Sequence, residues 1–251
     1  MNSNMLFHFI GIGGISMSAL AVMLSKKGFK VQGSNLEEND ETAMLQTHDI
    51  HIFFDHKASN IENADVVVYN SAIGESNPEL AYAKEKGLLI LTRAQMLASI
   101  SKDFENCIAI CGSHGKTTTT SMIAHILTDA GKKPTVHVGG VMRNYNSNFL
   151  IGDNKIFVTE ACEYKNNFHA LSPSTLVVLN IEADHLDFFK TFSAIEKSFQ
   201  TMVEKSQSVV IFSDTNLSLP KKTVLFCTES HICNKEEITL QDKPTLWASN
   251  L

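Results

Sequence analysis

The chain lacks the features that would place it in a membrane or outside the cell. No apolar run among its 251 residues reaches the length of about 18 residues that a bilayer-spanning helix needs. The first residues, Met1-Asn2-Ser3-Asn4, carry no basic region of the kind that begins a signal peptide. The sequence therefore predicts a cytoplasmic protein without a membrane-inserted segment.

Cysteine, metal-binding patterns and excess positive charge are also scarce. The ten histidines are scattered without a zinc-binding spacing. The formal charge of −6 argues against nucleic acid or an anionic membrane as the main partner. The five cysteines form no Cys-x-x-Cys pair, which predicts reduced thiols. They are Cys107, Cys111, Cys162, Cys227 and Cys233.

Short β-rich runs alternate with longer helical patterns, which predicts a parallel α/β architecture. At 251 residues the chain exceeds the usual size of one domain. A polar stretch at 101–106 indicates a domain boundary near residue 103. The predicted domains are therefore 1–102 and 103–251. The predicted strands are 6–10, 30–32, 65–69, 88–91, 107–110, 135–138, 155–158, 176–179, 208–212, 224–226 and 245–248, and the predicted helices are 16–27, 78–86, 118–129 and 191–204.

The strongest motif is a glycine loop between a predicted strand and a predicted helix, at 111–120. Its glycines allow backbone N–H groups to approach phosphate oxygens, and the first helical turn adds its dipole. Lys116 would place a charge on the β and γ phosphates, and Thr117 would offer a hydroxyl to magnesium. The usual first glycine is replaced by Ile110, so the loop is short, and a surface turn is the alternative interpretation.

A second glycine loop, 11–16, follows the first predicted strand. It resembles a dinucleotide fingerprint, but Ser16 occupies the place of the third glycine and no acidic residue ends the second strand. Backbone N–H groups at a helix start suit any diphosphate. A nicotinamide site and a structural turn both remain open. Two such loops in successive domains suggest one domain for a nucleotide-linked substrate and one for a triphosphate.

Polar side chains follow two later predicted strands. Glu160 lies at the carboxyl end of one strand, where α/β sheets bind ligands, and would suit magnesium. Asn180, Asp184 and His185 follow the next strand and are expected at the same edge of the sheet. The alternative for each is a solvated or structural role.

Together these stretches resemble the Mur ligase family, and within it the branch that joins L-alanine to UDP-N-acetylmuramate. The similarity covers residues from about 5 to 215 and includes the short form of the phosphate loop. It implies a Rossmann-like parallel-sheet domain followed by an incomplete, P-loop NTPase-like central domain. Further matching segments are 8–14, 33–35, 71–73, 77–79, 93–97, 160–164 and 180–187.

The resemblance implies a role for each matching residue, with ATP and Mg²⁺ as cofactors. Lys116, Glu160 and His185 would be catalytic, and Thr117, Glu160 and His185 would bind the metal. ATP phosphates would be held by Gly112, Ser113, His114, Gly115, Lys116, Thr117 and Thr118. The UDP-sugar would be held by Gly11, Gly13, Gly14, Ser34, Ser71, Asn146 and Asn148.

Family members are nearly twice as long, with a C-terminal domain that has no counterpart here. The sequence therefore predicts a truncated chain or a split gene, binding of a UDP-sugar with little or no ligase activity, and a complementing fragment as a partner. The alternatives are a murein-peptide recycling ligase, a non-catalytic UDP-sugar-binding remnant of a disrupted gene, and an unrelated P-loop kinase of small acids.

Overall fold

The computed structural model describes residues 4–212, 217–220 and 222–226. The chain divides into two compact units, and each is considered by itself. Unit 1 comprises the residues up to Ile100 together with Gly139–Ile151, and unit 2 comprises Ser101–Val138 and the residues from Gly152 onward. The segment Gly139–Ile151 is thus counted with a unit from which it is distant in sequence.

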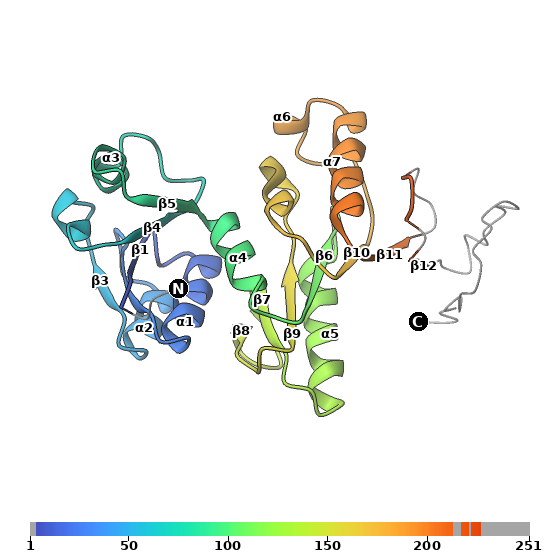
Figure 1. Cartoon of the computed structure of the whole chain (residues 1–251), viewed down its shortest axis with the longest axis horizontal. Coiled ribbons are helices and arrows are strands. Elements are labelled where there is room, and N and C mark those ends of the chain that lie inside the picture. Colours follow the sequence, from blue (N-terminus) through green and yellow to red (C-terminus); the bar gives the residue numbers. More distant parts are fainter. Residues whose placement is uncertain (1–3, 213–216, 221, 227–251) are drawn as a thin grey trace, which may run out of the picture. The chain divides into compact units, whose positions relative to one another are not determined.

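Unit 1 is built on a five-stranded sheet in the order β3-β2-β1-β4-β5, and its four neighbouring strand pairs are all parallel (Figure 1). From β1 the chain first moves to one side of the sheet and then to the other, so right-handed crossovers place the two sets of helices on opposite faces. The strands are β1 (Leu6–Ile10), β2 (Lys30–Ser34), β3 (His51–Phe53), β4 (Val66–Tyr69) and β5 (Leu89–Thr92), and the helices are α1 (Ile15–Lys26), α2 (Asp40–Gln46), the 3-10 helix η1 (Ala58–Ile61), α3 (Pro78–Glu85) and α4 (Arg93–Ser101).

The core of unit 1 forms because β1 and β4 are apolar and central. Phe9, Ile10 and Val67 are fully buried, as parallel strands covered on both faces require. Helix α1 buries an unbroken run of small and apolar residues from Met17 to Leu24. This packing fixes the carboxyl end of β1, from which the first glycine loop emerges.

Unit 2 contains most of a seven-stranded sheet, in the order β12-β11-β10-β6-β9-β7-β8 among the described residues (Figure 1). The amphipathic helix α7 buries Ile195, Phe199 and Met202. The strands are β6 (Asn106–Cys111), β7 (Thr135–Met142), β8 (Ser147–Leu150), β9 (Ile156–Glu160), β10 (Thr175–Val178), β11 (Ser208–Phe212) and β12 (Thr223–Phe226), and the helices are α5 (Lys116–Asp129), the 3-10 helix η2 (Tyr164–Ala170), α6 (Leu186–Phe189) and α7 (Phe192–Lys205).

The chain order reverses beside one central strand in each sheet. In unit 1, β1 lies between β2 and β4, and in unit 2, β6 lies between β9 and β10. Ligands of open α/β sheets bind at such switch points, beyond the carboxyl ends of the strands. Both glycine loops predicted from the sequence begin there, one directly after β1 and the other directly after β6.

The predicted α/β fold class is confirmed, and ten predicted strands and four predicted helices overlap observed elements. The sequence patterns did not reveal the strands β3 and β8, the helices α2, α4 and α6, or the 3-10 helices η1 and η2. Helix α2 begins at a capping box in which Asn39 accepts from the backbone N–H of Thr42, a local signal that hydrophobic periodicity does not register. The strand predicted at 245–248 lies outside the described residues.

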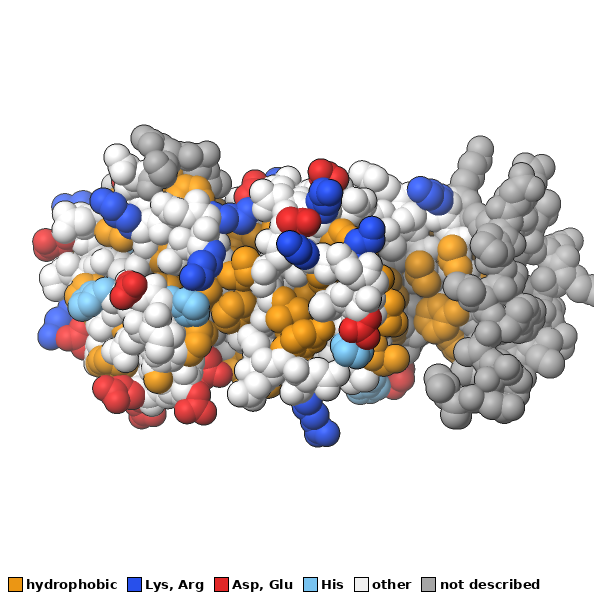
Figure 2. Space-filling view, turned by 90° about the horizontal axis from the view of Figure 1, so that it is seen from below, with side chains coloured by type: hydrophobic (Ala, Val, Ile, Leu, Met, Phe, Trp, Pro, Cys, Tyr) orange, Lys and Arg blue, Asp and Glu red, His pale blue; other side chains and the backbone are white. Residues whose placement is uncertain are grey.

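The surface carries mixed charge on the face seen in Figure 2, where basic and acidic side chains are interspersed. No helix in the described part of the chain combines the length and the apolar character that crossing a bilayer requires.

Candidate functional site

The loop after β6 wraps around the side chain of Asn180. The backbone N–H of His114 donates to Asn180 Oδ1 at 2.8 Å, and Asn180 Nδ2 donates back to the His114 carbonyl at 3.1 Å. Gly112 has φ of 139°, and a Cβ there would lie 3.1 Å from the backbone of Asn180. Only glycine fits this conformation and this close approach. Asn180, expected at this edge, therefore shapes the phosphate loop.

Lys116 is the first residue of α5, and its ammonium group is held within the loop. It donates to the carbonyls of Gly112 and Ser113 and, at 3.1 Å, to Glu163 Oε1. Glu163 is 2% exposed, so this ion pair is largely shielded from water. A shielded pair of this kind holds the lysine close to where the phosphates of a bound triphosphate would lie.

His185 contacts the same carboxylate. Its Nε2 lies 3.6 Å from Glu163 Oε1 and 3.8 Å from Asp184 Oδ2. Ligand atoms of Glu163, Asp184 and His185 all lie within 4.8 Å of one another. His185 adopts a left-handed backbone, with φ of 54°, where α6 begins. The loops after β9 and β10 thus bring together three groups that could hold a cation.

Glu160 ends β9, and its position differs from that of Glu163. Among the described residues, its Oε1 is buried without a hydrogen-bond partner, and the same holds for Glu163 Oε2. Buried unpaired carboxylate oxygens are costly unless a ligand or ion meets them. The sequence assigned the metal to Glu160, while the structure places Glu163 against Lys116 and His185. Glu163 lies in the same predicted stretch, but only the turn that follows β9 shows where its side chain points.

The remaining predicted residues of this loop lie at the start of α5. Thr117 and Thr118 occupy its first turn, and Gly115 precedes it with φ of 84°. Ser113 Oγ accepts from the backbone N–H of Glu182 at 2.9 Å. The Ser113 N–H also donates to the Asn180 carbonyl at 3.3 Å, so hydrogen bonds join the loop after β6 to the loop after β10.

Two neighbouring groups respond to the charge of this site. Burial, together with the negative charge of Glu163, raises the pKa of the Cys111 thiol, so the thiol stays protonated. The hydrogen bond that Tyr164 donates to Asp187, 3.2 Å long, raises the pKa of Tyr164. The Tyr164 ring lies 4.8 Å from the His185 ring, a contact that the sequence did not suggest.

In unit 1, the loop after β1 is held by the end of β2. The backbone N–H groups of Gly11 and Ile12 donate to the Ser34 carbonyl at 2.8 and 2.9 Å. The Gly13 N–H donates to Asn35 Oδ1 at 3.2 Å, and a Cβ on Gly13 would lie 2.7 Å from the Asn35 side chain. Asn35 therefore accepts a hydrogen bond from the first glycine loop, at the place where a dinucleotide fingerprint would have an acidic residue.

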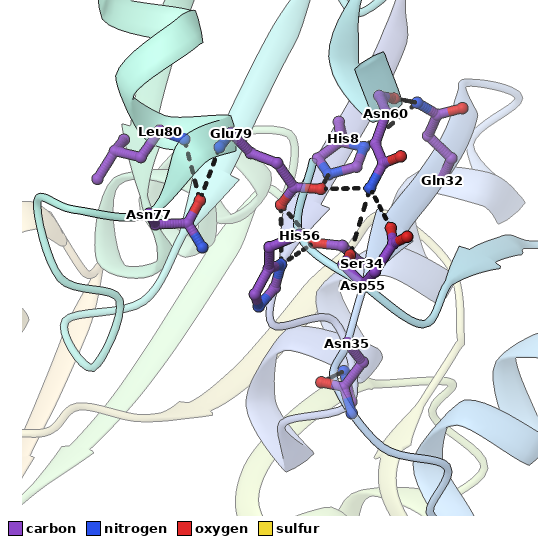
Figure 3. A network of polar contacts seen from close by, with 11 residues as sticks. His8, Gln32, Ser34, Asn35, Asp55, His56, Asn60, Asn77, Glu79 and Leu80 are labelled. Atoms are coloured by element: carbon purple, nitrogen blue, oxygen red, sulfur yellow. Dashed lines mark hydrogen bonds and ion pairs between the residues drawn. The ribbon is translucent and has the colours of Figure 1, made fainter. Parts of the chain in front are cut away.

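Ser34 is buried, and its hydroxyl is used inside the protein rather than exposed to a ligand (Figure 3). It donates to Glu79 Oε2 at 2.6 Å and lies 2.9 Å from His56 Nδ1. Glu79 is fully buried and also accepts from Asn60 Nδ2 at 2.8 Å, with His8 Nε2 at 3.6 Å. The role predicted for Ser34 would accordingly be exerted through this network.

The other residues predicted for the UDP-sugar lie in turns of unit 1 and, for Asn148, in β8. Gly14 precedes α1, Ser71 is exposed just after β4, and Asn146 is exposed in the turn between β7 and β8 with φ of 46°. Asn148 is 7% exposed and donates to the carbonyl of Ile15 at the start of α1. A residue far away in sequence thus supports the first glycine loop.

Comparison with known proteins finds two family models in succession along the chain. The model described as "Mur ligase family, catalytic domain" matches residues 6–105, and the one described as "Mur ligase middle domain" matches residues 110–232. A UDP-N-acetylmuramate–L-alanine ligase of Caldicellulosiruptor bescii is 41% identical over 249 residues, which are 98% of this chain and 53% of that protein. The chain thus spans about half the length of the curated relatives that it matches.

Solved structures of Mur ligases have the same fold as this chain. The UDP-N-acetylmuramate–alanine ligase MurC of Thermotoga maritima superposes with a TM-score of 0.80 at 33% identity, covering 90% of this chain and 53% of that one. The UDP-N-acetylmuramate:L-alanyl-gamma-D-glutamyl-meso-diaminopimelate ligase of Neisseria meningitides has a TM-score of 0.80 at 26% identity, covering 89% and 78%.

Proposed function

Because the chain belongs to the Mur ligase family and carries its catalytic and middle domains, we propose that it serves the ATP-dependent joining of L-alanine to UDP-N-acetylmuramate in the cytoplasm, for peptidoglycan precursor synthesis. The observation that carries this proposal is the placement of Lys116, Glu163 and His185 around the short phosphate loop. Identity of 41% over nearly the whole chain to a ligase of this specificity supports the choice of substrates.

The chemistry calls for an activated carboxylate. A carboxylate oxygen of the lactyl group attacks the γ phosphorus of ATP, ADP leaves, and an acyl phosphate forms. The alanine amine then attacks the acyl carbon and inorganic phosphate departs. A carboxylate alone is a poor electrophile because its leaving group would be oxide. Lys116 would neutralise charge that develops on the transferred phosphoryl group.

The residues present fit a magnesium ion, which would offset the negative charge of the triphosphate. The donor set consists of carboxylate and hydroxyl oxygens with one imidazole. Buried Glu163 Oε2 and Glu160 Oε1 have no hydrogen-bond partner in the part of the chain that the structure describes. Hard oxygen ligands are those that Mg²⁺ prefers. Thr117, Glu160, Glu163 and His185 would hold the ion, while Lys116 would bind the phosphates.

The murein-peptide ligase is the second candidate, since a structure of that specificity has the same fold. Its identity to this chain is 26%, against 41% for the alanine ligase of Caldicellulosiruptor bescii. The higher identity favours alanine as the amino acid.

Ligand selectivity tests the proposal. Calorimetric titration of the 251-residue chain with UDP-N-acetylmuramate, UDP-glucose and NAD should show the tightest binding for the muramoyl compound. Mg-ATP should bind independently, and Lys116→Ala should weaken that binding about 100-fold because a charge-assisted contact to phosphate is lost. Lys132→Ala, at an exposed position beyond α5, is the matched control. Equal affinity for the three first compounds would overturn the proposal.

A further inference from the structure

The imidazole of His185 faces two carboxylates without being held by either. Its Nε2 lies 3.6 Å from Glu163 Oε1 and 3.8 Å from Asp184 Oδ2, and both distances are too long for a hydrogen bond. In the described part of the chain, neither ring nitrogen of His185 forms a hydrogen bond, and the side chain is 33% exposed. Histidines that bind metals are usually oriented by a hydrogen bond from the second ring nitrogen. The orientation of His185 therefore depends on another kind of contact.

The side chain of Tyr164 supplies that contact. The centroids of the Tyr164 and His185 rings lie 4.8 Å apart, with an angle of 43° between the ring planes. Rings attract one another at centroid distances of this order. Because a ring packed against an imidazole also blocks some of its staggered rotamers, this contact restricts the directions in which His185 can point.

Tyr164 is itself braced by α6. Its hydroxyl donates to Asp187 Oδ2 at 3.2 Å, and Asp187 lies two residues after His185. The Phe188 ring meets the Tyr164 ring edge-on, with centroids 6.2 Å apart. Since Tyr164 directly follows Glu163, these contacts join the segment that carries the carboxylate to the segment that carries the imidazole.

The backbone that presents Tyr164 is anchored to α7. Lys165 and Asn166 both have left-handed conformations, with φ of 52° and 57°, which residues other than glycine seldom adopt. The Asn166 N–H donates to the Glu163 carbonyl at 2.9 Å, and Asn166 Oδ1 accepts from Ser198 Oγ of α7 at 2.5 Å. Within unit 2, η2, α6 and α7 pack against one another (Figure 1). A strained turn that its neighbours hold in this way presents its side chains in one position.

We propose that Tyr164 is the positioning residue of the cluster formed by Glu163, Asp184 and His185. Its ring keeps the imidazole turned toward Glu163, and its hydrogen bond to Asp187 keeps the ring in place. The cluster then has the geometry to accept a cation before the cation arrives, which avoids the cost of ordering a side chain on binding. The inference rests on the proposed function, because the cation is taken to be the magnesium ion of Mg-ATP.

The orientation of His185 can be measured without any ligand. Three-bond coupling constants from NMR show whether χ1 of a side chain holds one staggered rotamer or averages over several. We expect one His185 rotamer in the unaltered 251-residue chain and in Tyr164→Phe, which keeps the ring. Tyr164→Leu removes the ring and should give averaged couplings.

Binding tests whether Tyr164 acts through His185. With Mn²⁺ as the probe, Tyr164→Leu should weaken Mn-ATP binding about tenfold, the lower end of what residues that orient metal ligands contribute. Tyr164→Phe should lose less than about threefold, because its exposed hydrogen bond contributes little. In a chain that already carries His185→Gln, Tyr164→Leu should cause no further loss. A merely structural role would give the same loss in both backgrounds.

Phe192→Leu is the matched control. Phe192 is an exposed aromatic residue of unit 2, and among the described residues its ring does not contact His185. Replacing this aromatic residue by leucine should leave both the His185 couplings and the affinity for Mn-ATP unchanged.

Three outcomes overturn the inference. One is a His185 rotamer distribution that is the same in the unaltered chain and in Tyr164→Leu. Another is an unchanged affinity of that variant for Mn-ATP, and the third is an equal loss with and without His185→Gln. A chain that does not bind Mn-ATP or does not prefer UDP-N-acetylmuramate would instead count against the proposed function, while the couplings of the ligand-free chain would still decide the role of Tyr164.

Discussion

Each unit places a buried carboxylate beside its glycine loop, but the two carboxylates differ in how completely they are satisfied. In unit 1, Glu79 accepts from Ser34, Asn60 and His56, and His8 lies against it. In unit 2, Glu163 meets Lys116 and His185 through Oε1, while its Oε2 is buried without a partner. The first group is saturated by the protein, and the second is not.

The difference teaches how each loop can meet an anion. A saturated carboxylate can only hold its partners, so Glu79 stabilises the end of β2 and orients an imidazole. A buried carboxylate oxygen without a partner raises the free energy of the folded state, and a bound ion would remove this penalty. Glu163 is therefore suited to bind an ion as well as to hold Lys116. Unit 1 would therefore recognise its phosphates with a rigid protein surface, and unit 2 with a lysine and an added cation.

The largest effect should come from the carboxylates of unit 2. We expect Glu163→Gln to weaken Mg-ATP binding about 10- to 100-fold, the range typical of groups that hold or orient a metal. ATP without magnesium should bind more tightly to this variant, because Lys116 loses its anionic partner. Titration of ATP with and without Mg²⁺ measures both effects.

Glu160→Gln compares the second carboxylate that would hold the ion. It removes the carboxylate at the end of β9, which forms no ion pair or hydrogen bond with Lys116 among the described residues. A smaller loss than for Glu163→Gln is expected. An equal or larger loss would show that Glu160, the residue assigned from the sequence, contributes at least as much to metal binding as Glu163.

An intermediate effect should appear in unit 1 when Glu79 is changed. Glu79→Gln puts an amide where Ser34 and His56 donate, and such mismatches cost about 1–3 kcal/mol. Hydrogen exchange of β1 and β2 amides at neutral pH measures the opening free energy of this unit. Glu85→Gln, on the exposed side of α3, should leave it unchanged, and a similar loss in both variants would contradict the assignment.

The same measurement has a defined pH dependence. The pKa of Glu79 is lower in the folded chain than its ordinary value of 4.5. The stabilising contribution is therefore complete above the pKa of the unfolded chain and disappears as the pH falls through the lowered folded value. The gap between the unaltered chain and Glu79→Gln should narrow at pH values below about 4.

An effect of similar size should come from the backbone of the glycine loop after β6. Gly112→Ala forces a strained φ and brings Cβ to 3.1 Å from Asn180, for which about 1–3 kcal/mol is expected. Gly131→Ala shares a positive φ but meets nothing within 4 Å. Thermal unfolding should show a larger loss for Gly112→Ala, and equal losses would mean that Asn180 does not constrain the loop.

Much of the fold could be read from the chain because its signals are local. The strands at 6–10 and 208–212 were predicted with the bounds that the structure shows, since apolar β-branched and aromatic runs are bounded by turn residues. Both glycine loops were found because each lies between a strand and a helix in sequence. The short elements β3 and α2 were missed, because three to seven residues give little periodicity.

The site was harder to predict, since its contacts join residues that are distant in sequence. Lys116 was recognised from its motif, but its partner Glu163 lies 47 positions away. The sequence selected Glu160 instead, because it stands at the end of the strand pattern. Both metal assignments remain predictions, and the residues predicted for UDP-sugar and ATP do as well.

The sequence by itself determined the α/β class, the two glycine loops and the family to which they belong, because each depends on residues close together along the chain. Only the tertiary structure decided that Glu163 faces Lys116, that Asn180 shapes the phosphate loop, and that Glu79 holds Ser34 and His56. These contacts exist because the strand order reverses beside β1 and β6, which brings the loops after neighbouring strands to one edge of each sheet.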